Sequence, residues 1–447
     1  MRTSMADLWG KWPRKTAEFL ISVINQLVFI VFDFLDVVMC IFFSYVDKFL
    51  EGKPTECYCR SQNGISDCEE KNTGISDTLL GRKNIFREMG FSRITPSRSG
   101  QRQSSKKTGS GDMGKTRWSD CGCASCVSWM KNGDDAKLHV VVKEPIPSEG
   151  EGNGENVIFL HGFLSSSFLW TESVFPELNG SKYKLFAVDL LGFGNSPKPR
   201  ECRYTLNDHM ERIEKSVIHE FNLTSFHLVA HSMGCIIALA LAAKHPNNLK
   251  SITLIAPPCF LSSGEEEATQ IALKKLAYKR LWPPLSFGAS FMTWYEHLGR
   301  CVCFFVCRYH TTWEKILKFI TRQRKLNFLV RDLTRHTHHS AWHTMHNVIC
   351  GGAKMMDPCL ETLRVARARV SVVQGSRDLV VPVECSNNVK VKVPDAEVKI
   401  INGVGHTAVI IGREKEFAKD LQLIWDSVTN TKDLVAYQKR TKLKPSL

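Results

Sequence analysis

A serine, an aspartate and a histidine in the second half of the sequence could together carry out nucleophilic catalysis. Ser232 lies between an apolar run that predicts a buried strand, 226–230, and an aliphatic run that predicts a buried helix, 236–243. A serine at such a sharp strand-to-helix turn fits the G-x-S-x-G nucleophile elbow, with Ala230 in place of the first glycine. Because the same residue types also occur as plain helix caps, the interpretation requires catalytic partners elsewhere in the chain.

Two downstream residues are candidates for the base and for the group that orients it. Asp378 follows a predicted strand at 368–374, and His406 follows the next predicted strand at 397–401. Both side chains are therefore expected at the sheet edge where ligands bind in open α/β folds. In the predicted triad, His406 takes the hydroxyl proton of Ser232, while Asp378 fixes the tautomer of the imidazole and stabilises its charge.

An oxyanion hole for this serine requires two backbone N–H groups. One is expected from Met233, directly after the nucleophile, and the other from Phe163, in the loop after the predicted strand 156–160. His161 and Gly162 would support this loop, the glycine by permitting a tight backbone and the imidazole by tying the loop down. His161 as a second catalytic base is the alternative interpretation.

Strands and helices alternate around these motifs, which predicts an α/β fold with a mostly parallel sheet and helices on both faces. Further strands are predicted at 137–143, 184–188 and 249–256, and helices at 170–178, 206–221, 383–391 and 414–427. The alternation stops over an aromatic and basic block at 259–363, which we interpret as a helical cap inserted after the sixth strand.

The chain is thus predicted to consist of an anchor, a linker, a two-part core, a cap and a tail. The boundaries are 1–50 for a hydrophobic signal or anchor segment, 51–136 for a poorly structured, cysteine-containing basic linker, 137–258 and 364–430 for the core, 259–363 for the cap and 431–447 for a basic tail. The net charge of +14 is unevenly spread: residues 81–118 of the linker hold ten Lys or Arg against Glu88 and Asp112, and this run could contact an anionic membrane surface. Nucleic-acid binding is disfavoured because no recognition module accompanies the charge.

The N-terminal segment resembles a signal sequence or a membrane anchor. A basic flank precedes the apolar stretch 18–50, and the positive-inside rule would leave the catalytic part outside the cytoplasm. Polar residues in this stretch recur at helical spacing and form one stripe: Ser22, Gln26, Asp33, Asp36, Cys40, Ser44 and Asp47. Such a helix could pack in a membrane against a partner or lie in the interface, and both cleavage and retention remain open.

The cysteines and histidines predict disulfides rather than a metal site. The clustered cysteines are Cys57, Cys59 and Cys68, then Cys121, Cys123 and Cys126, then Cys301, Cys303 and Cys307. They contain no pair of C-x-x-C motifs, and disulfides in an oxidising compartment are favoured. Sequons at Asn179 and Asn222 fit that compartment. The histidine-rich segment 335–346 lacks the glutamate of H-E-x-x-H, so it is interpreted as a polar surface of the cap, and neither metal nor cofactor is expected.

Five motifs, HGFLSSSFLW, DLLGFGNSPKP, LVAHSMGC, QGSRDLVVP and GVGHTAVI, together resemble the plant BODYGUARD family of α/β-hydrolase-fold proteins. The resemblance runs from about Leu138 to the C-terminus, and the hydrophobic N-terminus and cysteine-rich linker also fit. It implies an extracellular, cell-wall-associated protein of the epidermis that is needed for the cuticle, described as a probable lysophospholipase or an enzyme of cutin formation. The serine, aspartate and histidine of the family correspond to Ser232, Asp378 and His406.

The resulting prediction is a secreted or membrane-anchored serine esterase that acts on lipid esters through an acyl-enzyme. An extracellular acyltransferase or cutin polyester synthase, which passes the acyl group to an alcohol, is the alternative. A non-catalytic ligand-binding protein on the same fold is a third possibility. Expected partners are a lipid ester substrate and a membrane surface or the cell-wall and cuticle matrix. Ser232 argues against epoxide hydrolases and haloalkane dehalogenases, which carry aspartate at the elbow.

Overall fold

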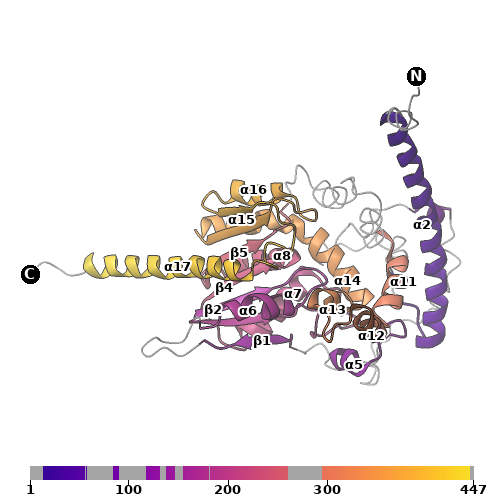
Figure 1. Ribbon diagram of the computed structural model, residues 1–447, viewed down its shortest axis with the longest axis horizontal. Coiled ribbons are helices and arrows are strands. Elements are labelled where there is room, and N and C mark those ends of the chain that lie inside the picture. The colour runs from indigo at the N-terminus through magenta and orange to yellow at the C-terminus, as the bar shows by residue number, and fades with distance from the viewer. Residues whose placement is uncertain are drawn as a thin grey trace, which may run out of the picture.

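A seven-stranded sheet forms the centre of the protein, in the order β1-β3-β2-β4-β5-β6-β7 (Figure 1). The structure, a computed structural model, describes residues 14–55, 57, 84–89, 117–130, 137–145, 155–180, 182–259 and 294–442. The strands are β1 (Val140–Lys143), β2 (Glu155–Leu160), β3 (Tyr183–Val188), β4 (Phe226–His231), β5 (Leu249–Ile255), β6 (Arg369–Gly375) and β7 (Glu397–Ile401). β1 is antiparallel to β3 and the other pairs are parallel, so the catalytic candidates after β4, β6 and β7 share one sheet edge.

Helices cover both faces of this sheet, which confirms the predicted fold class. Strand side chains alternate between the faces, so Ile158 and Leu160 join one core cluster while Val157 and Phe159 join the other. The first face is covered by α7 (Leu206–Ile213), η5 (Glu214–Ile218), α8 (Met233–Lys244), α15 (Met356–Val365) and α16 (Val383–Lys392). The second is covered by η4 (Trp170–Val174), α6 (Phe175–Glu177) and α17 (Glu414–Lys442).

The cap is inserted between β5 and β6, that is, after the fifth strand of the described residues rather than the sixth. Its described helices are α11 (Glu296–Val306), α12 (His310–Thr321), α13 (Phe328–Asp332), α14 (His338–Thr344), η6 (Met345–Cys350) and η7 (Gly352–Met355). The predicted cap residues 260–293 lie outside the described part of the chain.

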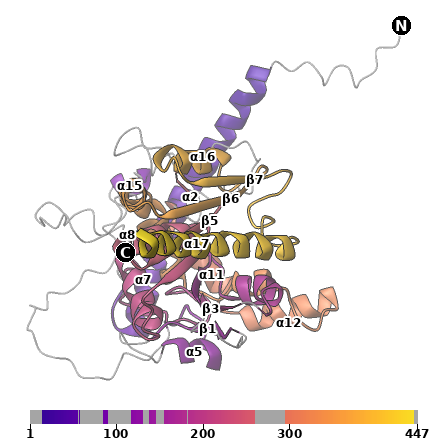
Figure 2. The ribbon, with the colours of Figure 1, turned by 90° about the vertical axis from the view of Figure 1, so that its left-hand side faces the viewer.

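One helix of the predicted cap range belongs to the core. α15 lies beside α8 and α16 in the helix layer of the sheet (Figure 2). Its buried residues recur at helical spacing: Met356, Cys359, Leu360 and Leu363. Two parallel strands require a crossover that packs back onto the sheet, and α15 provides the end of that crossover between β5 and β6.

The N-terminal segment forms one 38-residue helix, α2 (Arg14–Glu51), which lies along the cap next to α11 (Figure 1). Its residues 26–51 are long and apolar enough to cross a membrane, with a mean hydropathy of 2.4. The polar stripe is largely the docking face, because Asp33, Asp36, Cys40, Ser44 and Asp47 are buried whereas Gln26 is exposed. The partner of the stripe is therefore the cap of the same chain.

Buried hydrogen bonds and ion pairs hold α2 in this position. The Tyr295 hydroxyl donates to Oδ1 of Asp33 at 3.0 Å, and the backbone N–H of His297 donates to Oδ1 of Asp36 at 3.0 Å. The Arg300 guanidinium binds both carboxylate oxygens of Asp47 at 2.7 and 2.8 Å. These contacts explain how aspartates are tolerated in so apolar a helix, since buried charges require partners.

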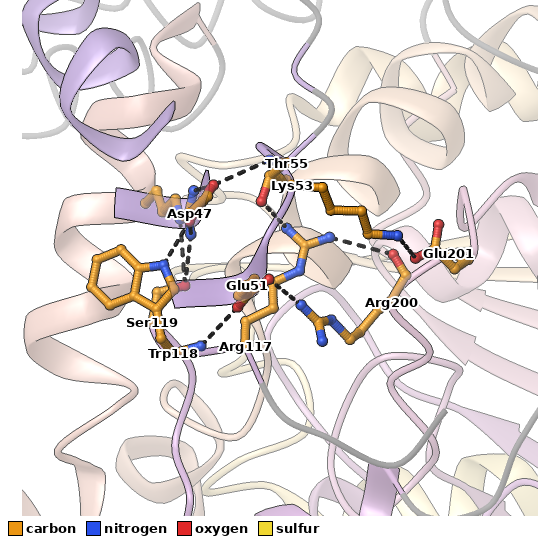
Figure 3. A network of polar contacts seen from close by, with 10 residues as sticks. Asp47, Glu51, Lys53, Thr55, Arg117, Trp118, Ser119, Arg200 and Glu201 are labelled. Atoms are coloured by element: carbon orange, nitrogen blue, oxygen red, sulfur yellow. Dashed lines mark hydrogen bonds and ion pairs between the residues drawn. The ribbon is translucent and has the colours of Figure 1, made fainter. Parts of the chain in front are cut away.

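The end of α2 is also connected to the linker and to the core (Figure 3). The indole N–H of Trp118 donates to Asp47 at 2.6 Å, and its backbone N–H donates to Glu51 at 3.0 Å. The Arg200 guanidinium, from the loop after β3, forms an ion pair with Glu51. Helix α2, the linker and the core therefore meet in one polar network.

Helices also occur in the linker, which was predicted to be poorly structured, and in the predicted basic tail. The linker forms α4 (Ile85–Glu88) and α5 (Ala124–Met130), and α17 continues through the predicted tail to Lys442. α4 is fixed because the amide of Asn84 donates to the Asp33 carbonyl at 3.0 Å and Arg87 pairs with Asp36. Most of the basic run of the linker lies outside the described residues.

Candidate active site

Ser232 occupies the sharp turn between β4 and α8 with φ 53° and ψ −122°. A positive φ is costly for a residue with a side chain, and such strain persists only where the surroundings enforce it. The Ser232 N–H donates to the Ile255 carbonyl at 2.8 Å, and the Ser232 carbonyl accepts from Cys235 N–H at 2.9 Å. Ala230 is fully buried and paired with Leu160 in the sheet, so the alanine at this position is compatible with the elbow conformation.

The structure brings the three predicted catalytic residues into hydrogen-bonding contact. Nε2 of His406 lies 2.9 Å from Oγ of Ser232, and Nδ1 of His406 lies 2.8 Å from Oδ2 of Asp378. The Asp378 carboxylate is held in place by the backbone N–H groups of Val380 and Val381, both 2.8 Å from Oδ1. A carboxylate can only accept, so Nδ1 carries the imidazole proton and Nε2 is free to accept from the serine hydroxyl.

Two neighbouring side chains that the sequence analysis did not single out support this arrangement. The Gln374 amide donates to the Val381 carbonyl at 2.7 Å and contacts Asp378 at 3.5 Å. Nε2–H of His231 donates to the His406 carbonyl at 3.3 Å, and the two rings are in tilted contact with centroids 4.8 Å apart. Burial, with the nearby His406, lowers the pKa of His231 to about 3, so its ring is neutral. In the sequence, the position of His231 directly before the nucleophile could have identified this residue. No sequence feature singled out Gln374.

His161 lies at the end of β2 with both ring nitrogens engaged. Nε2 accepts from the Leu190 N–H at 2.9 Å, which leaves Nδ1–H to donate to the Gly162 carbonyl at 2.7 Å. Burial lowers the pKa of His161, in agreement with a neutral ring. These contacts fit the predicted role in fixing the loop, and neither nitrogen is available to act as a second base.

The predicted oxyanion-hole residues lie on the two segments that border the serine. Met233 is the first residue of α8, where backbone N–H groups have no partner within the helix. Phe163 follows Gly162, and a Cβ added to Gly162 would lie 3.2 Å from Cβ of Ser232. The loop after β2 therefore passes directly beside the nucleophile, as an oxyanion loop must.

Two aspartates fix the remainder of that loop. Asp189 accepts from the backbone N–H of Ser167 at 2.5 Å and of Asn195 at 2.8 Å, and Asp332 of the cap accepts from the Ser166 hydroxyl at 2.5 Å. Burial would raise the pKa of Asp189, but hydrogen bonds led by that of His139 lower it to about 2. Among the described residues the Asp332 carboxylate accepts from the Ser166 hydroxyl alone, and burial raises its pKa to about 7.

The histidine-rich segment is not the polar surface that was predicted. His336, His343 and His346 are buried, and Nε2–H of His339 donates to the Cys202 carbonyl of the core at 2.8 Å. Burial lowers the pKa of His343 to about 3. The segment therefore packs the cap onto the core instead of facing solvent.

The predicted disulfides are absent from the two described cysteine clusters. Free thiols are found at Cys121, Cys123, Cys126, Cys301, Cys303 and Cys307, whereas Cys59 and Cys68 lie outside the described residues. Thiols in both clusters point at a histidine, Cys126 at His310 and Cys307 at His336. The spacing of the cysteines could not show this, because His310 is 184 residues from Cys126 and His336 is 29 residues from Cys307.

Comparison with known proteins agrees with this fold. Residues 155–283 match the family model of the alpha/beta hydrolase fold. "Probable lysophospholipase BODYGUARD 4" of Arabidopsis thaliana is 49% identical over 421 residues, covering 93% of this chain and 99% of the relative. "Probable lysophospholipase BODYGUARD 5" of the same plant is 47% identical over 436 residues, covering 92% and 97%. The solved structure of a thermophilic esterase from Thermogutta terrifontis is 16% identical with a TM-score of 0.43, covering 65% and 94%.

The parallel sheet and the family match define this protein as one of the α/β-hydrolase fold. More narrowly, the similarity over almost the whole length of both chains shows that it belongs to the BODYGUARD family.

Proposed function

We propose that the protein is a serine hydrolase that cleaves carboxylic esters of lipids through an acyl-enzyme. The observation that carries this proposal is the hydrogen-bonded series from Ser232 through His406 to Asp378, with the serine at an elbow of positive φ. The names of the relatives, probable lysophospholipases, favour a lipid substrate.

The geometry supports the following sequence of steps. Nε2 of His406 accepts the hydroxyl proton while Oγ of Ser232 forms a bond with the ester carbonyl carbon. The carbonyl oxygen becomes negative and is stabilised by the N–H groups of Met233 and Phe163. The tetrahedral intermediate then expels the alcohol, which takes its proton from His406, and water releases the fatty acid in the same way. Asp378 stabilises the imidazolium at both stages.

The surface of α2 supports a membrane location for the enzyme. Opposite its docked stripe, α2 exposes an apolar face at helical spacing that consists of Leu27, Val31, Phe34, Val38, Phe42, Tyr45 and Phe49. Large exposed apolar patches mark interaction sites, and a helix with one polar and one apolar face lies in a membrane interface. We therefore infer that α2 lies on a lipid surface with its apolar face, where lipid esters are supplied to the active site.

The buried contacts of α2 favour its retention in the mature protein. Removal would leave Arg300, which is 6% exposed, without the carboxylate of Asp47. An uncompensated buried charge typically costs about 3–5 kcal/mol. Mass spectrometry of the mature protein would test this, and an N-terminus beyond Glu51 would contradict it.

We also propose action at the plant cell surface during cuticle formation, on the basis of the family resemblance. The two sequon asparagines, Asn179 and Asn222, are exposed, so both could carry glycans. A glycosidase-sensitive shift in electrophoretic mobility is expected for protein made in plant cells and should disappear in Asn179→Gln/Asn222→Gln.

Plants in which Ser232→Ala is the only form of the protein should have a permeable cuticle. A normal cuticle in such plants would exclude a catalytic role of the protein in cuticle formation.

A fluorophosphonate probe tests the catalytic proposal directly. The full chain and Ser232→Ala would be incubated with the probe, then supplied with a lysophospholipid or with a monoacylglycerol of a hydroxy-fatty acid. Labelling of the parent alone, with release of free fatty acid, is expected. Probe labelling of the parent together with formation of acylglycerol oligomers, instead of free fatty acid, would indicate the acyltransferase. No labelling of folded parent protein would leave a non-catalytic binding protein.

A further inference from the structure

Four possible metal ligands converge where the linker meets the cap. Cys121 and Cys123 lie just before α5, Cys126 lies in its first turn, and His310 is the first residue of α12. The three Sγ atoms and one imidazole nitrogen all lie within 4.8 Å of one another. Cys126 and His310 are buried, at 9% and 5% exposed, and the other two thiols are half-buried. The cluster thus joins chain segments separated by 184 residues.

The distances in this cluster fit a tetrahedral zinc site. Zinc binds sulfur at about 2.3 Å and imidazole nitrogen at about 2.0 Å, so tetrahedral angles separate S and N by about 3.5 Å. Nε2 of His310 lies 3.4 Å from Sγ of Cys126 and 3.6 Å from Sγ of Cys123. A disulfide would instead bring two sulfurs to about 2.05 Å and would leave the third thiol and the imidazole without a role.

The surroundings of the cluster also resemble those of metal ligands. A histidine bound to a metal commonly donates its other N–H to a carboxylate, and Nδ1 of His310 lies 3.4 Å from Oε1 of Glu314. The backbone N–H of Cys123 points at Sγ of Cys121 at 3.5 Å, which would stabilise a thiolate. Glu314 follows His310 by one helical turn, so α12 presents ligand and supporting group on one face.

We propose that Cys121, Cys123, Cys126 and His310 bind one zinc ion in a closed structural site. Three cysteines and one histidine are an established ligand set for structural zinc, in which no position remains open for substrate. This proposal departs from the prediction of no metal site, because the fourth ligand cannot be identified from cysteine spacing alone.

The site would fasten the linker to the cap. Just before the cysteines, Trp118 contacts Asp47 and Glu51 of α2, and Arg117 contacts Arg200 of the core (Figure 3). Zinc at this position would therefore hold the segment that clamps the end of α2. Metal binding of this kind contributes directly to folding stability.

A second cluster of possible zinc ligands lies in the cap, so the test must compare the zinc content of each variant with that of the parent. Cys303 on α11 and Cys307, directly after its end, lie one turn apart, and their sulfurs are 3.7 and 3.5 Å from Nε2 of His336. It supplies three ligand atoms, one fewer than a closed tetrahedral site needs, so the proposal does not extend to it. Any zinc bound there should be unaffected by changes at His310.

The test is the zinc content of the purified full chain, supplied with ZnCl2 under reducing conditions and measured by plasma mass spectrometry. Cys126→Ser and His310→Ala should each contain about one equivalent less zinc than the parent. Half-buried Cys301→Ser and exposed His219→Ala are matched controls and should retain the parent content. His310→Cys, which keeps four ligands, should also retain it, so that loss through misfolding is distinguished from loss of a ligand.

Cobalt and thermal measurements provide readouts independent of activity. Co2+ should give tetrahedral d–d bands in the parent, with thiolate charge-transfer absorbance reduced in Cys126→Ser. A chelator should lower the Tm of the parent by several degrees, and Zn2+ should restore it, with no such response in His310→Ala. Equal zinc in parent and His310→Ala would overturn the proposal. A zinc-free parent in which these cysteines are disulfide-bonded, although Ser232 still reacts with fluorophosphonate, would overturn it as well.

Discussion

The hydroxyl of Ser166 donates a hydrogen bond to Asp332 at 2.5 Å and thereby ties the loop beside the nucleophile to helix α13 of the cap. The other carboxylate oxygen, Oδ1, is buried without a hydrogen-bond partner among the described residues. Such a carboxyl group is stable in its neutral form, and burial, reinforced by the nearby Asp189, raises its pKa to about 7. The contact between cap and loop therefore changes its charge near neutral pH.

This pKa predicts how stability depends on pH. The unfolded carboxyl has a pKa of about 3.9, so between about pH 4 and 7 the folded state binds more protons at Asp332 than the unfolded state does. The contribution of Asp332 to stability must fall as pH rises through this window. Asp332→Asn, which keeps an acceptor for Ser166, should therefore raise the Tm at pH 8 by several degrees but change it little at pH 5.

Asp357→Asn is the control for this experiment, because Asp357 pairs with Lys392 at the surface. Its effect on Tm should be small and similar at both pH values. A lower Tm of Asp332→Asn at pH 8 than at pH 5, relative to the parent, would show that the carboxyl is ionised and stabilising.

The tautomer of His406 predicts the effect of removing the charge of Asp378. In Asp378→Asn an amide N–H can face Nδ1, which then becomes the acceptor and leaves the proton on Nε2. Nε2 can no longer take the proton of Ser232, so kcat should fall by about 10³–10⁴-fold while the fold is retained. Ester hydrolysis measures kcat, with Asp357→Asn again as the control. Activity within tenfold of the parent would contradict the proposed triad.

The ion pair between Asp47 and Arg300 predicts that α2 is part of the folded unit. Asp47 is 1% exposed and binds Arg300 and Trp118, so Asp47→Ala leaves a buried guanidinium unpaired. The expected loss is about 3–5 kcal/mol, read from unfolding by denaturant in detergent, together with faster proteolysis between α2 and the linker. Lys48→Ala, at the exposed neighbouring position, should change neither by more than about 0.5 kcal/mol. An equal effect of both variants would argue against docking of α2.

The close approach of α8 to β2 predicts that Gly234 does not tolerate a side chain. A Cβ there would lie 2.6 Å from the His161 carbonyl and 2.9 Å from the Leu160 carbonyl, and backbone atoms cannot yield easily. Gly234→Ala should therefore displace the elbow, lower kcat by about 10²-fold and cost about 1–3 kcal/mol. Ala230→Gly restores the usual elbow glycine and should not raise kcat, because Ser232 already has the elbow conformation. Unchanged activity of Gly234→Ala would show that the helix can shift without harm.

The strands, most helices and the order of the three catalytic candidates could be predicted from sequence because their signals are local. The apolar run before Ser232 and the aliphatic run after it specify β4 and α8 by periodicity, and Asp378 and His406 follow two similar strands. Since the carboxyl ends of parallel strands meet at one edge of the sheet, this pattern by itself predicts that the three residues lie close together. Local periodicity did not distinguish α15 from the cap helices, because each has an apolar face.

The contacts that depend on packing between distant segments were decided by the tertiary structure. Ser166 and Asp332 are 166 residues apart in the sequence. The sequence likewise does not identify the partner of the polar stripe of α2, which in the structure packs against α11. Cysteine spacing predicted disulfides, yet the thiols of Cys126 and Cys307 face histidines of the cap. Sequence spacing reports which side chains share one helix or strand. Which faces meet depends on how the whole chain buries its apolar surface, and that is a property of the complete fold.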